Sequence, residues 1–392
     1  MRVLQVIDDM GLNSGVSSML LNYYRYIDHD KVNFDFMVYN TVSDDVKEYC
    51  KRNHSRIYEV GPLSGKTVLN GTLYKKVEGV MKRYAKKYDV IHGHESNTAF
   101  IYMKLAKKYG INHRIIHSHN AKGADGMVKK VRNFILNHYG LKYVTDYCAC
   151  SKKAAKYLYG TTNHINIINN AIDINKFQFQ PEVRNRMRKK LGVEDMFVVG
   201  HVGRFAPQKN HEYIIDVFWQ FHQKVQNSKL VLIGDGELME AIKQKVHVLH
   251  LDDAVLFEGV QNNVHEYMQA MDVFVLPSMY EGFPVVCVEA QAAGLTCVVS
   301  KEVTREIKIT KNVKFIGIDN KCPVLRSAVQ SNQKNQKDIN DWVQTLIKIR
   351  EKKNVDSRKL CADKVAKKGF DIREQSKKLE NYYIKLSNHM KC

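Results

Sequence analysis

The sequence predicts an α/β protein of two Rossmann-like, doubly wound domains that face a central cleft. The first observation is length, because 392 residues exceed one ordinary core and suit two domains. The second is that short β-rich runs alternate with longer amphipathic ones, which is typical of parallel strands covered by helices. The third is that this alternation occurs twice, on either side of a polar interruption at 177–195 that contains Pro181.

The predicted strands form two series. The first comprises residues 2–8, 33–39, 56–60, 89–93, 113–118, 146–150 and 165–169. The second comprises residues 197–203, 229–235, 254–259, 272–277, 296–300 and 313–318. Helices are expected between the strands, because parallel pairing needs crossover connections. We expect an N-terminal domain at 1–185, a C-terminal domain at 186–370, and a helix at 371–392 that packs back on the N-terminal domain.

The composition of the chain indicates which classes of partner and which cellular compartment to expect. The formal net charge of +20 predicts attraction to nucleic acid, anionic lipid or phosphorylated substrates. The first apolar run is too short for a signal-peptide core, and no run of about 18 uncharged apolar residues predicts a membrane span. The eight cysteines are scattered, and only Cys148 and Cys150 lie close together, so we expect reduced thiols in a cytoplasm.

Three turns at strand ends are candidate phosphate sites. The loop GLNSG, from Gly11 to Gly15, precedes a helical pattern and suits a phosphate or sugar, although a tight turn explains it too. Arg204 and Lys209 follow the strand at 197–203 and could clamp a pyrophosphate, the alternative being a solvated basic turn. Asn210 is expected to cap the next helix. The G-D-G turn at 234–236 indicates either a nucleotide or simple turning.

The segment YEGFPVVCVEAQAAGL, residues 280–295, places two glutamates around a predicted helix at 284–293. Pro284 suits the first helical position and Gly294 the C-terminal cap. Free amides near the helix start predict an anion site; they belong to Gly282, Phe283 and Val285. Carboxylates beside an anion site make sense if they bind hydroxyl groups. Glu281 would then hold a sugar and Glu289 a ribose, whereas two surface glutamates are the alternative.

The block E-G-F-P-V-V-C-V-E resembles the E-x(7)-E motif of glycosyltransferase family 4, which comprises retaining GT-B enzymes that use nucleotide-sugar donors. The resemblance covers nearly the whole chain and is closest to the subgroup that builds capsular and extracellular polysaccharides. It also rests on GLNSGVSSMLLNYYR, IIHSHNA, IINNAIDINKF and VGRFAPQKN. Three departures stand out: Ser14 replaces a glycine, Asn169 and Ala171 replace the interdomain proline and glycine, and 319–338 has no counterpart.

The resemblance implies a role for each matching residue. His117 and Glu281 are the expected catalytic residues, His117 beside the reacting sugar and the acceptor. The expected donor-binding residues are Gly15, Arg204, Lys209, Val260, Gly282, Phe283, Val285 and Glu289. Among these, Arg204 and Lys209 would bind the donor phosphates, Glu289 the ribose, and Val260 would lie near the base. His119 and Asn170 are expected on the acceptor side of the cleft.

Two histidine motifs, HGHE at 92–95 and HSH at 117–119, admit a metal site, because His-x-His on an extended chain puts both rings on one face. The basic clamp already neutralises a diphosphate, and the resembled family generally works without metal. We therefore expect no metal and no cofactor besides the nucleotide-sugar donor, most simply a UDP-hexose.

The positive charge is concentrated locally. Residues 101–156 hold twelve Lys or Arg and two acids. Within this region, the helix predicted at 126–140 has an apolar side formed by Met127, Val131, Phe134, Ile135 and Tyr139. Its other side carries Lys129, Lys130, Arg132 and Asn133. This pattern fits an interfacial helix on an anionic membrane, and it fits a core-facing helix with a solvated basic back equally well.

We therefore expect a cytoplasmic enzyme, peripheral on the inner face of the plasma membrane. It would transfer a hexosyl unit with retention from a UDP-sugar to a growing lipid-linked saccharide in exopolysaccharide or capsule biosynthesis. One alternative is a nucleotide-sugar epimerase of the same fold, which needs no acceptor. A basic nucleic-acid-binding protein is a weaker alternative, because no nucleic-acid motif is present and acids interrupt the basic surface.

Overall fold

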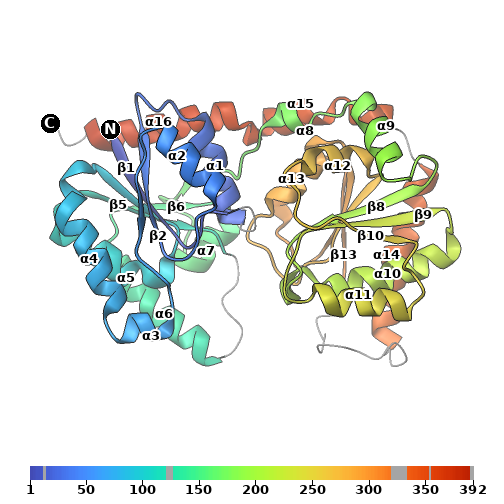
Figure 1. Ribbon diagram of the computed structural model, residues 1–392, viewed down its shortest axis with the longest axis horizontal. Helices are drawn as coiled ribbons and strands as arrows, with labels where there is room; N and C mark the ends of the chain where they lie inside the picture. Colours follow the sequence, from blue (N-terminus) through green and yellow to red (C-terminus); the bar gives the residue numbers. More distant parts are fainter. Residues whose placement is uncertain (12–14, 121–126, 319–332, 353–354, 389–392) are drawn as a thin grey trace. The chain divides into compact units, whose positions relative to one another are not determined.

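The computed structural model describes residues 1–392 apart from 12–14, 121–126, 319–332, 353–354 and 389–392. The chain forms two compact units, each built on a parallel sheet covered by helices (Figure 1). Unit 1 comprises Met1–Ala171 and Asp371–Cys392, and unit 2 comprises Ile172–Phe370. The predicted α/β class with two doubly wound sheets is confirmed. No helix in the described part of the chain is both long and apolar enough to cross a membrane.

Within the described residues, unit 1 contains a seven-stranded parallel sheet in the order β3-β2-β1-β4-β5-β6-β7. Its strands are β1 (Arg2–Ile7), β2 (Asn33–Val38), β3 (Ile57–Glu59), β4 (Val90–Gly93), β5 (His113–Ser118), β6 (Asp146–Ala149) and β7 (Asn166–Ile167). The order reverses between β1 and β4. Open α/β sheets bind ligands at the carboxyl ends of strands beside such a reversal.

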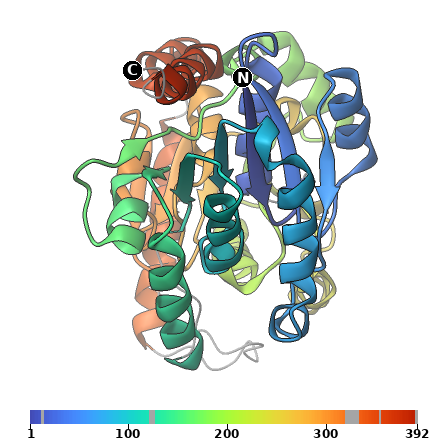
Figure 2. The same ribbon diagram turned by 90° about the vertical axis from the view of Figure 1, so that its left-hand side faces the viewer.

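Helices cover both faces of the unit 1 sheet. They are α1 (Gly15–Tyr26), α2 (Asp44–Arg52), α3 (Gly65–Leu69), α4 (Thr72–Tyr84), α5 (Ala99–Lys108), α6 (Met127–Leu141), α7 (Lys152–Tyr159) and α16 (Ile372–Asn388). Because side chains of a strand alternate, Val3 and Ile7 enter a core with α1 and α16, while Leu4 and Val6 enter a core with α4 and α5. The C-terminal α16, red in Figure 2, lies beside α1.

Unit 2 repeats this plan with a six-stranded sheet, within the described residues, in the order β10-β9-β8-β11-β12-β13. The strands are β8 (Phe197–Val202), β9 (Ser228–Ile233), β10 (Val255–Phe257), β11 (Val273–Leu276), β12 (Thr296–Ser300) and β13 (Val313–Ile316). The helices are α8 (Ile174–Phe177), α9 (Pro181–Lys190), α10 (His211–Lys224), α11 (Met239–Val248), α12 (Val264–Ala270), α13 (Val285–Ala292), α14 (Gln333–Glu351) and α15 (Cys361–Val365). The order reverses between β8 and β11.

The division between the units falls at Ala171 and Ile172, not at the predicted 185/186. Residues after this point are tied to unit 2. The amide of Ile172 donates to the carbonyl of Phe370 (3.0 Å). The guanidinium groups of Arg184 and Arg188 both bind Asp272, at 2.6 and 3.2 Å. The polar composition of 177–195 therefore reflects a basic helix packed on unit 2 instead of a linker.

Every predicted strand is present. Residues 113–118 and 296–300 match β5 and β12 at both ends. The predictions at 165–169 and 254–259 are too long, since only Asn166–Ile167 and Val255–Phe257 are strands, each at an edge of its sheet. One capping prediction is wrong. Asn210 occupies the N-cap position of α10 but makes no side-chain cap, because its φ of 59° is left-handed instead of the extended conformation that capping needs. Its Nδ2 donates to the carbonyl of Pro277 (3.4 Å).

Candidate functional site

Two loops of unit 2 are joined at the carboxyl edge of its sheet, because β8 and β11 are neighbouring parallel strands. The carbonyl of Gln208, after β8, accepts a hydrogen bond from the amide of Met279 (2.8 Å). The Nε2 of Gln208 donates to the carbonyl of Tyr280 (2.9 Å). These bonds hold the loop with Arg204 and Lys209 against the segment that precedes α13.

The same two loops are linked by an ion pair. Lys209 Nζ donates to Glu281 Oε1 at 2.6 Å, and the side chains are 19% and 9% exposed. Water screens a pair this buried less than it screens a surface pair. The sequence predicted separate ligands for these residues, a phosphate for Lys209 and a sugar for Glu281. The structure brings them into contact, so the carboxylate neutralises the ammonium group.

Arg204 has a weaker partner. Its Nη2 lies 3.4 Å from Glu237 Oε2, and both side chains are more than half exposed. Such a surface pair contributes little stability, so an anionic ligand can replace Glu237 at small cost. Glu237 was not predicted as a site residue. Its only sequence signal is its position directly after the G-D-G turn.

The G-D-G turn itself serves close packing. A Cβ atom on Gly234, which has φ of +135°, would lie 2.2 Å from the carbonyl oxygen of Gly203. A Cβ atom on Gly236 would lie 2.6 Å from the carbonyl oxygen of Phe205. The turn after β9 thus packs directly on the loop after β8. The sequence left open whether this turn binds a nucleotide or only reverses the chain direction. This geometry supports a purely structural turn.

Two buried histidines that were not predicted lie under the basic loop. His201 Nδ1 hydrogen-bonds to the carbonyl of Val275 (2.8 Å), and the ring of His211 stacks on Phe205 at 4.0 Å. Burial is the main cause that lowers the pKa of His201 to about 4 and that of His211 to about 2. Both rings are therefore neutral near pH 7 and add no charge beneath Lys209.

The predicted helix after Glu281 is α13, with Pro284 at its N-cap position and Gly294 just beyond its C-terminal cap with φ of +75°. The amide of Cys287 in the first turn donates to the carbonyl of Pro284 (3.1 Å), and the positive end of the helix dipole makes this end suit an anion. Gly282 and Phe283 precede this end and Val285 is its first residue.

Two further predicted donor residues lie elsewhere on unit 2. Glu289 is partly buried in α13, and desolvation raises its pKa to about 7. The carboxyl group is therefore poised to change protonation state near neutral pH. Val260 follows β10 and is 44% exposed. It lies in a different loop from the ion pair of Lys209 and Glu281.

The other predicted site residues belong to unit 1. His117 is 1% exposed in β5, and the ring of His119, just after the strand, stacks on it at 4.1 Å. Asn170 follows β7 and is 6% exposed. Gly15 is the first residue of α1, while Ser14 and the rest of 12–14 lie outside the described residues.

The two units therefore present different chemistry. Unit 2 combines cations and helix amides, which suit a phosphate, with carboxylates, which accept hydrogen bonds from hydroxyl groups. Unit 1 presents neutral imidazoles that can donate or accept one hydrogen bond per nitrogen. By its own residues, unit 2 therefore suits a ligand that carries both a diphosphate and sugar hydroxyls.

Comparison with solved structures identifies the architecture as the GT-B fold. The chain is similar to the crystal structure of Anabaena Alr3699/HepE in complex with UDP-glucose, with a TM-score of 0.76 and 18% identity. The similarity covers 97% of this chain and 99% of that one. At this level of identity it concerns the fold alone.

The sequence comparisons match glycosyltransferases. Residues 183–355 match the family model described as "Glycosyl transferases group 1". EpsF of Bacillus subtilis, which is named as a glycosyltransferase, is 29% identical over 314 residues, or 78% of this chain and 80% of that protein. The UDP-Gal:alpha-D-GlcNAc-diphosphoundecaprenol alpha-1,3-galactosyltransferase of Escherichia coli is 32% identical over 235 residues, or 58% of this chain and 56% of that protein. Fold and sequence together support a glycosyltransferase of the GT-B fold.

Proposed function

We propose that this protein is a retaining glycosyltransferase that moves a hexosyl unit from a UDP-sugar to a growing lipid-linked saccharide in exopolysaccharide or capsule biosynthesis. The observation that carries the proposal is the Lys209–Glu281 pair, held directly before α13 at the carboxyl edge of the unit 2 sheet. The ammonium group of Lys209 can bind a diphosphate. The carboxylate of Glu281 beside it can accept a hydrogen bond from a sugar hydroxyl.

The donor is proposed to bind unit 2. Arg204, Lys209 and the amides at the start of α13 stabilise the leaving diphosphate as its negative charge grows during transfer. When the phosphate takes Lys209, the carboxylate of Glu281 is released to accept hydrogen bonds from the sugar. Glu289 accepts from the ribose, and Val260 lies near the base. The cations and helix amides already offset the diphosphate charge, so no metal cofactor is proposed for transfer.

Unit 1 is proposed to supply the acceptor side. Burial lowers the pKa of His117 well below its ordinary value, so its ring is neutral and can hold a sugar hydroxyl. His119 and Asn170 are proposed to line the acceptor's path, and Gly15 starts the helix that follows the glycine loop. The lipid-linked acceptor is the kind of substrate named for the Escherichia coli relative.

Helix α6 is proposed to hold the enzyme on an anionic membrane, at the cytoplasmic face. Its apolar residues Val131, Phe134, Ile135 and Tyr139 are 52%, 74%, 47% and 55% exposed. A core-facing helix would bury these side chains, so their exposure favours the interfacial alternative. The basic region 101–156, with twelve Lys or Arg, adds electrostatic attraction to anionic lipid.

The test is a screen of nucleotide-sugar donors with bacterial lipid extracts, read out by release of nucleoside diphosphate and by labelled lipid. Release that requires both one donor and a lipid acceptor supports transfer, and retention follows if the product linkage has the donor's anomeric configuration. Donor conversion without any acceptor supports the epimerase instead. Low-nanomolar duplex binding with steep salt dependence supports the nucleic-acid alternative. Activity that EDTA abolishes and Mg²⁺ restores contradicts the metal-free donor site.

A further inference from the structure

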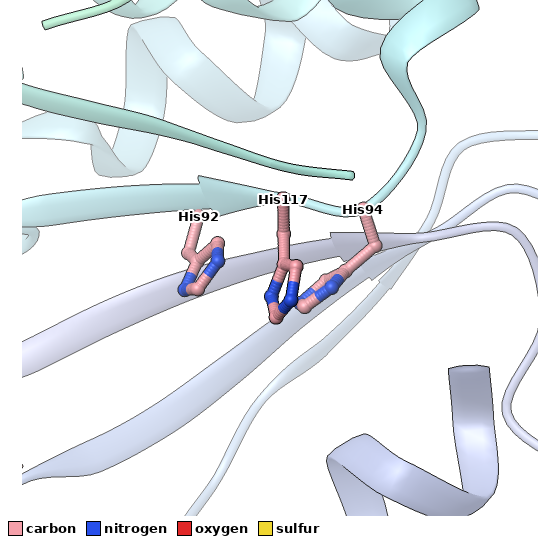
Figure 3. Close-up of side chains that lie close together, drawn as sticks. All are labelled: His92, His94 and His117. Atoms are coloured by element: carbon pink, nitrogen blue, oxygen red, sulfur yellow. The ribbon is translucent and has the colours of Figure 1, made fainter. Parts of the chain in front are cut away.

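Four histidines of unit 1 lie together at the carboxyl ends of β4 and β5. The strands are parallel neighbours with His92 opposite Ile115 and Gly93 opposite Ile116, so the next residues along, His94 and His117, are level with one another. Because side chains alternate along a strand, His92 and His94 share one face of the sheet with His117 and His119. Figure 3 shows the rings of His92, His94 and His117 extending to the same side of the strands.

The ring nitrogens converge. One nitrogen from each of His92, His94 and His117 can be chosen so that all three lie within 4.8 Å of one another. The Nε2 of His119 lies 2.8 Å from the Nδ1 of His94, which brings a fourth imidazole to the cluster. Among the described residues, His92 Nε2 and both nitrogens of His117 have no hydrogen-bond partner. His117 is 1% exposed, so an unpaired ring in this position is costly.

Outer groups hold two of the rings from behind. His92 Nδ1 lies 2.6 Å from the hydroxyl of Tyr383 in α16, and His94 Nε2 lies 3.0 Å from Gln5 Oε1 in β1. Gln5 in turn donates to the Tyr383 hydroxyl at 3.2 Å. An oxygen partner on one nitrogen is the arrangement that orients metal-binding imidazoles. It leaves Nε2 of His92 for an ion, whereas Nδ1 of His94 must exchange its contact with His119 Nε2 (2.8 Å) for the ion.

Burial also keeps the rings in the form that binds metal ions. Desolvation is the main cause that lowers the pKa of His92 and that of His119 to about 3, and it lowers the pKa of His94 and that of His117 well below the ordinary value. Neutral imidazole carries the lone pair that a metal ion needs.

We propose that His92, His94 and His117, with His119 as a fourth candidate ligand, form a binding site for a divalent transition-metal ion of the Zn²⁺ class. All ligands are neutral imidazoles, which suit Zn²⁺ and its neighbours, whereas Mg²⁺ and Ca²⁺ require oxygen ligands. Tetrahedral Zn²⁺ with Zn–N bonds of about 2.0–2.1 Å places its ligand nitrogens about 3.4 Å apart. Nitrogens of His92, His94 and His117 that lie up to 4.8 Å apart would move inward to bind one ion, whereas His119 Nε2, 2.8 Å from His94 Nδ1, would move slightly outward to join them.

The metal-binding residues belong to unit 1, whereas the donor is proposed to bind unit 2, and the ion itself takes no part in the proposed transfer. An ion on His117 would occupy the lone pair that the proposed function gives to a sugar hydroxyl. Zn²⁺ is therefore expected to inhibit turnover reversibly, while chelation leaves turnover intact. Inhibition, but not binding, rests on the proposed function.

Binding is measured on the full chain without a polyhistidine tag and without donor or acceptor. Isothermal titration with Zn²⁺ and visible spectroscopy with Co²⁺ are expected to show one ion per chain and the absorption of a tetrahedral Co²⁺–imidazole complex. His92→Gln and His117→Gln should each weaken binding by at least about a hundredfold. Tyr383→Phe should weaken binding by about tenfold to a hundredfold, the range for loss of an outer partner. His247→Gln is the matched control, because its ring is exposed on α11.

Each outcome of these experiments either supports or overturns the metal site or its link to the proposed function. A wild-type chain that binds neither Zn²⁺ nor Co²⁺ overturns the site, as does binding that is equal in wild type, His92→Gln and His117→Gln. If a variant does not fold, the test rests on the wild type: absence of the tetrahedral Co²⁺–imidazole spectrum overturns the site. Where Zn²⁺ inhibits wild type but not His92→Gln, the link to His117 is supported. Binding at this cluster without inhibition keeps the metal site and contradicts the proposed role of His117.

Discussion

Lys209 Nζ and Glu281 Oε1 lie 2.6 Å apart although 72 positions separate them in the chain. The pair joins the loop after β8 to the segment before α13, and the carboxylate is 9% exposed. Without Lys209, Glu281 would be a largely buried charge with its main partner removed. The two residues therefore form a unit in the ligand-free protein, and a ligand that binds one of them must change the surroundings of the other.

A double-mutant cycle tests this coupling. Lys209→Met is expected to lower the Tm more than the double variant Lys209→Met/Glu281→Gln, because only the single change leaves an unpaired buried carboxylate. Removing one partner of a buried pair costs about 3–5 kcal/mol, and partial exposure of Lys209 puts this pair at the lower end. Scanning fluorimetry measures the difference. Lys243→Met, in an exposed pair with Glu240, is the control and should change the Tm little. Additive changes in the Tm would show that the pair is uncoupled.

Donor affinity is expected to depend on both cations. Arg204→Ala and Lys209→Ala should each weaken UDP binding by about 1–3 kcal/mol, the range for hydrogen bonds to charged groups. Isothermal titration calorimetry measures the affinity, with Lys243→Ala as an exposed basic control on α11. Unchanged UDP affinity in both variants excludes this loop as the phosphate site.

Substitutions of Glu281 and Glu289 are expected to have different effects on UDP binding and turnover. Glu289→Ala should weaken the binding of UDP itself, because Glu289 is proposed to hold the ribose. Glu281→Gln should keep UDP affinity or raise it, because the change frees Lys209 for the phosphate, while most turnover is lost. Titration calorimetry and a diphosphate-release assay on the same preparations measure the two effects. Equal losses of UDP affinity would contradict the division of roles.

The pH dependence of stability is expected to report on Glu289. Desolvation raises the pKa of its carboxyl group from 4.5 to about 7. Its contribution to stability is therefore complete below the unfolded pKa and is lost as the pH rises through about 7, by at most about 3 kcal/mol. Glu289→Gln removes this loss, so the Tm of the variant relative to wild type should increase between about pH 5 and about pH 8. A constant difference in the Tm between the two proteins across this range contradicts the pKa shift.

Membrane binding is expected to depend on the exposed face of α6. Phe134→Ser should weaken binding to anionic liposomes by about tenfold to a hundredfold, because burying a phenylalanine side chain is worth about 1.5–3 kcal/mol. Neutralising Arg132 together with Lys129 and Lys130 should weaken binding by on the order of a hundredfold, at about 1 kcal/mol for each charge at the surface. Co-sedimentation measures both effects, with Val248→Ser, an exposed apolar residue of unit 2, as the control. If the wild type binds neutral and anionic liposomes equally, the basic face of α6 serves a partner other than an anionic membrane.

Local patterns predicted the elements well, because a strand is recognised from residues adjacent in sequence. The β-rich runs at 113–118 and 296–300 match β5 and β12 at both ends, and the proline and glycine around α13 marked where this helix lies. The edge strand β7 was predicted too long because an edge strand has one neighbour to extend its hydrogen bonding. The boundary at Ala171 was missed because a basic helix packed through buried arginines has the composition of a linker.

The sequence by itself determined the two doubly wound sheets and placed Arg204, Lys209, Glu281 and His117 at the ends of strands. Only the tertiary structure decided that Lys209 and Glu281 are partners, and that His94 is level with His117. The physical reason is that alternation and capping act over a few residues, whereas these contacts depend on which strands become neighbours. Strand order reverses beside β1 and again beside β8, and no local pattern in the chain records which carboxyl ends are thereby brought together.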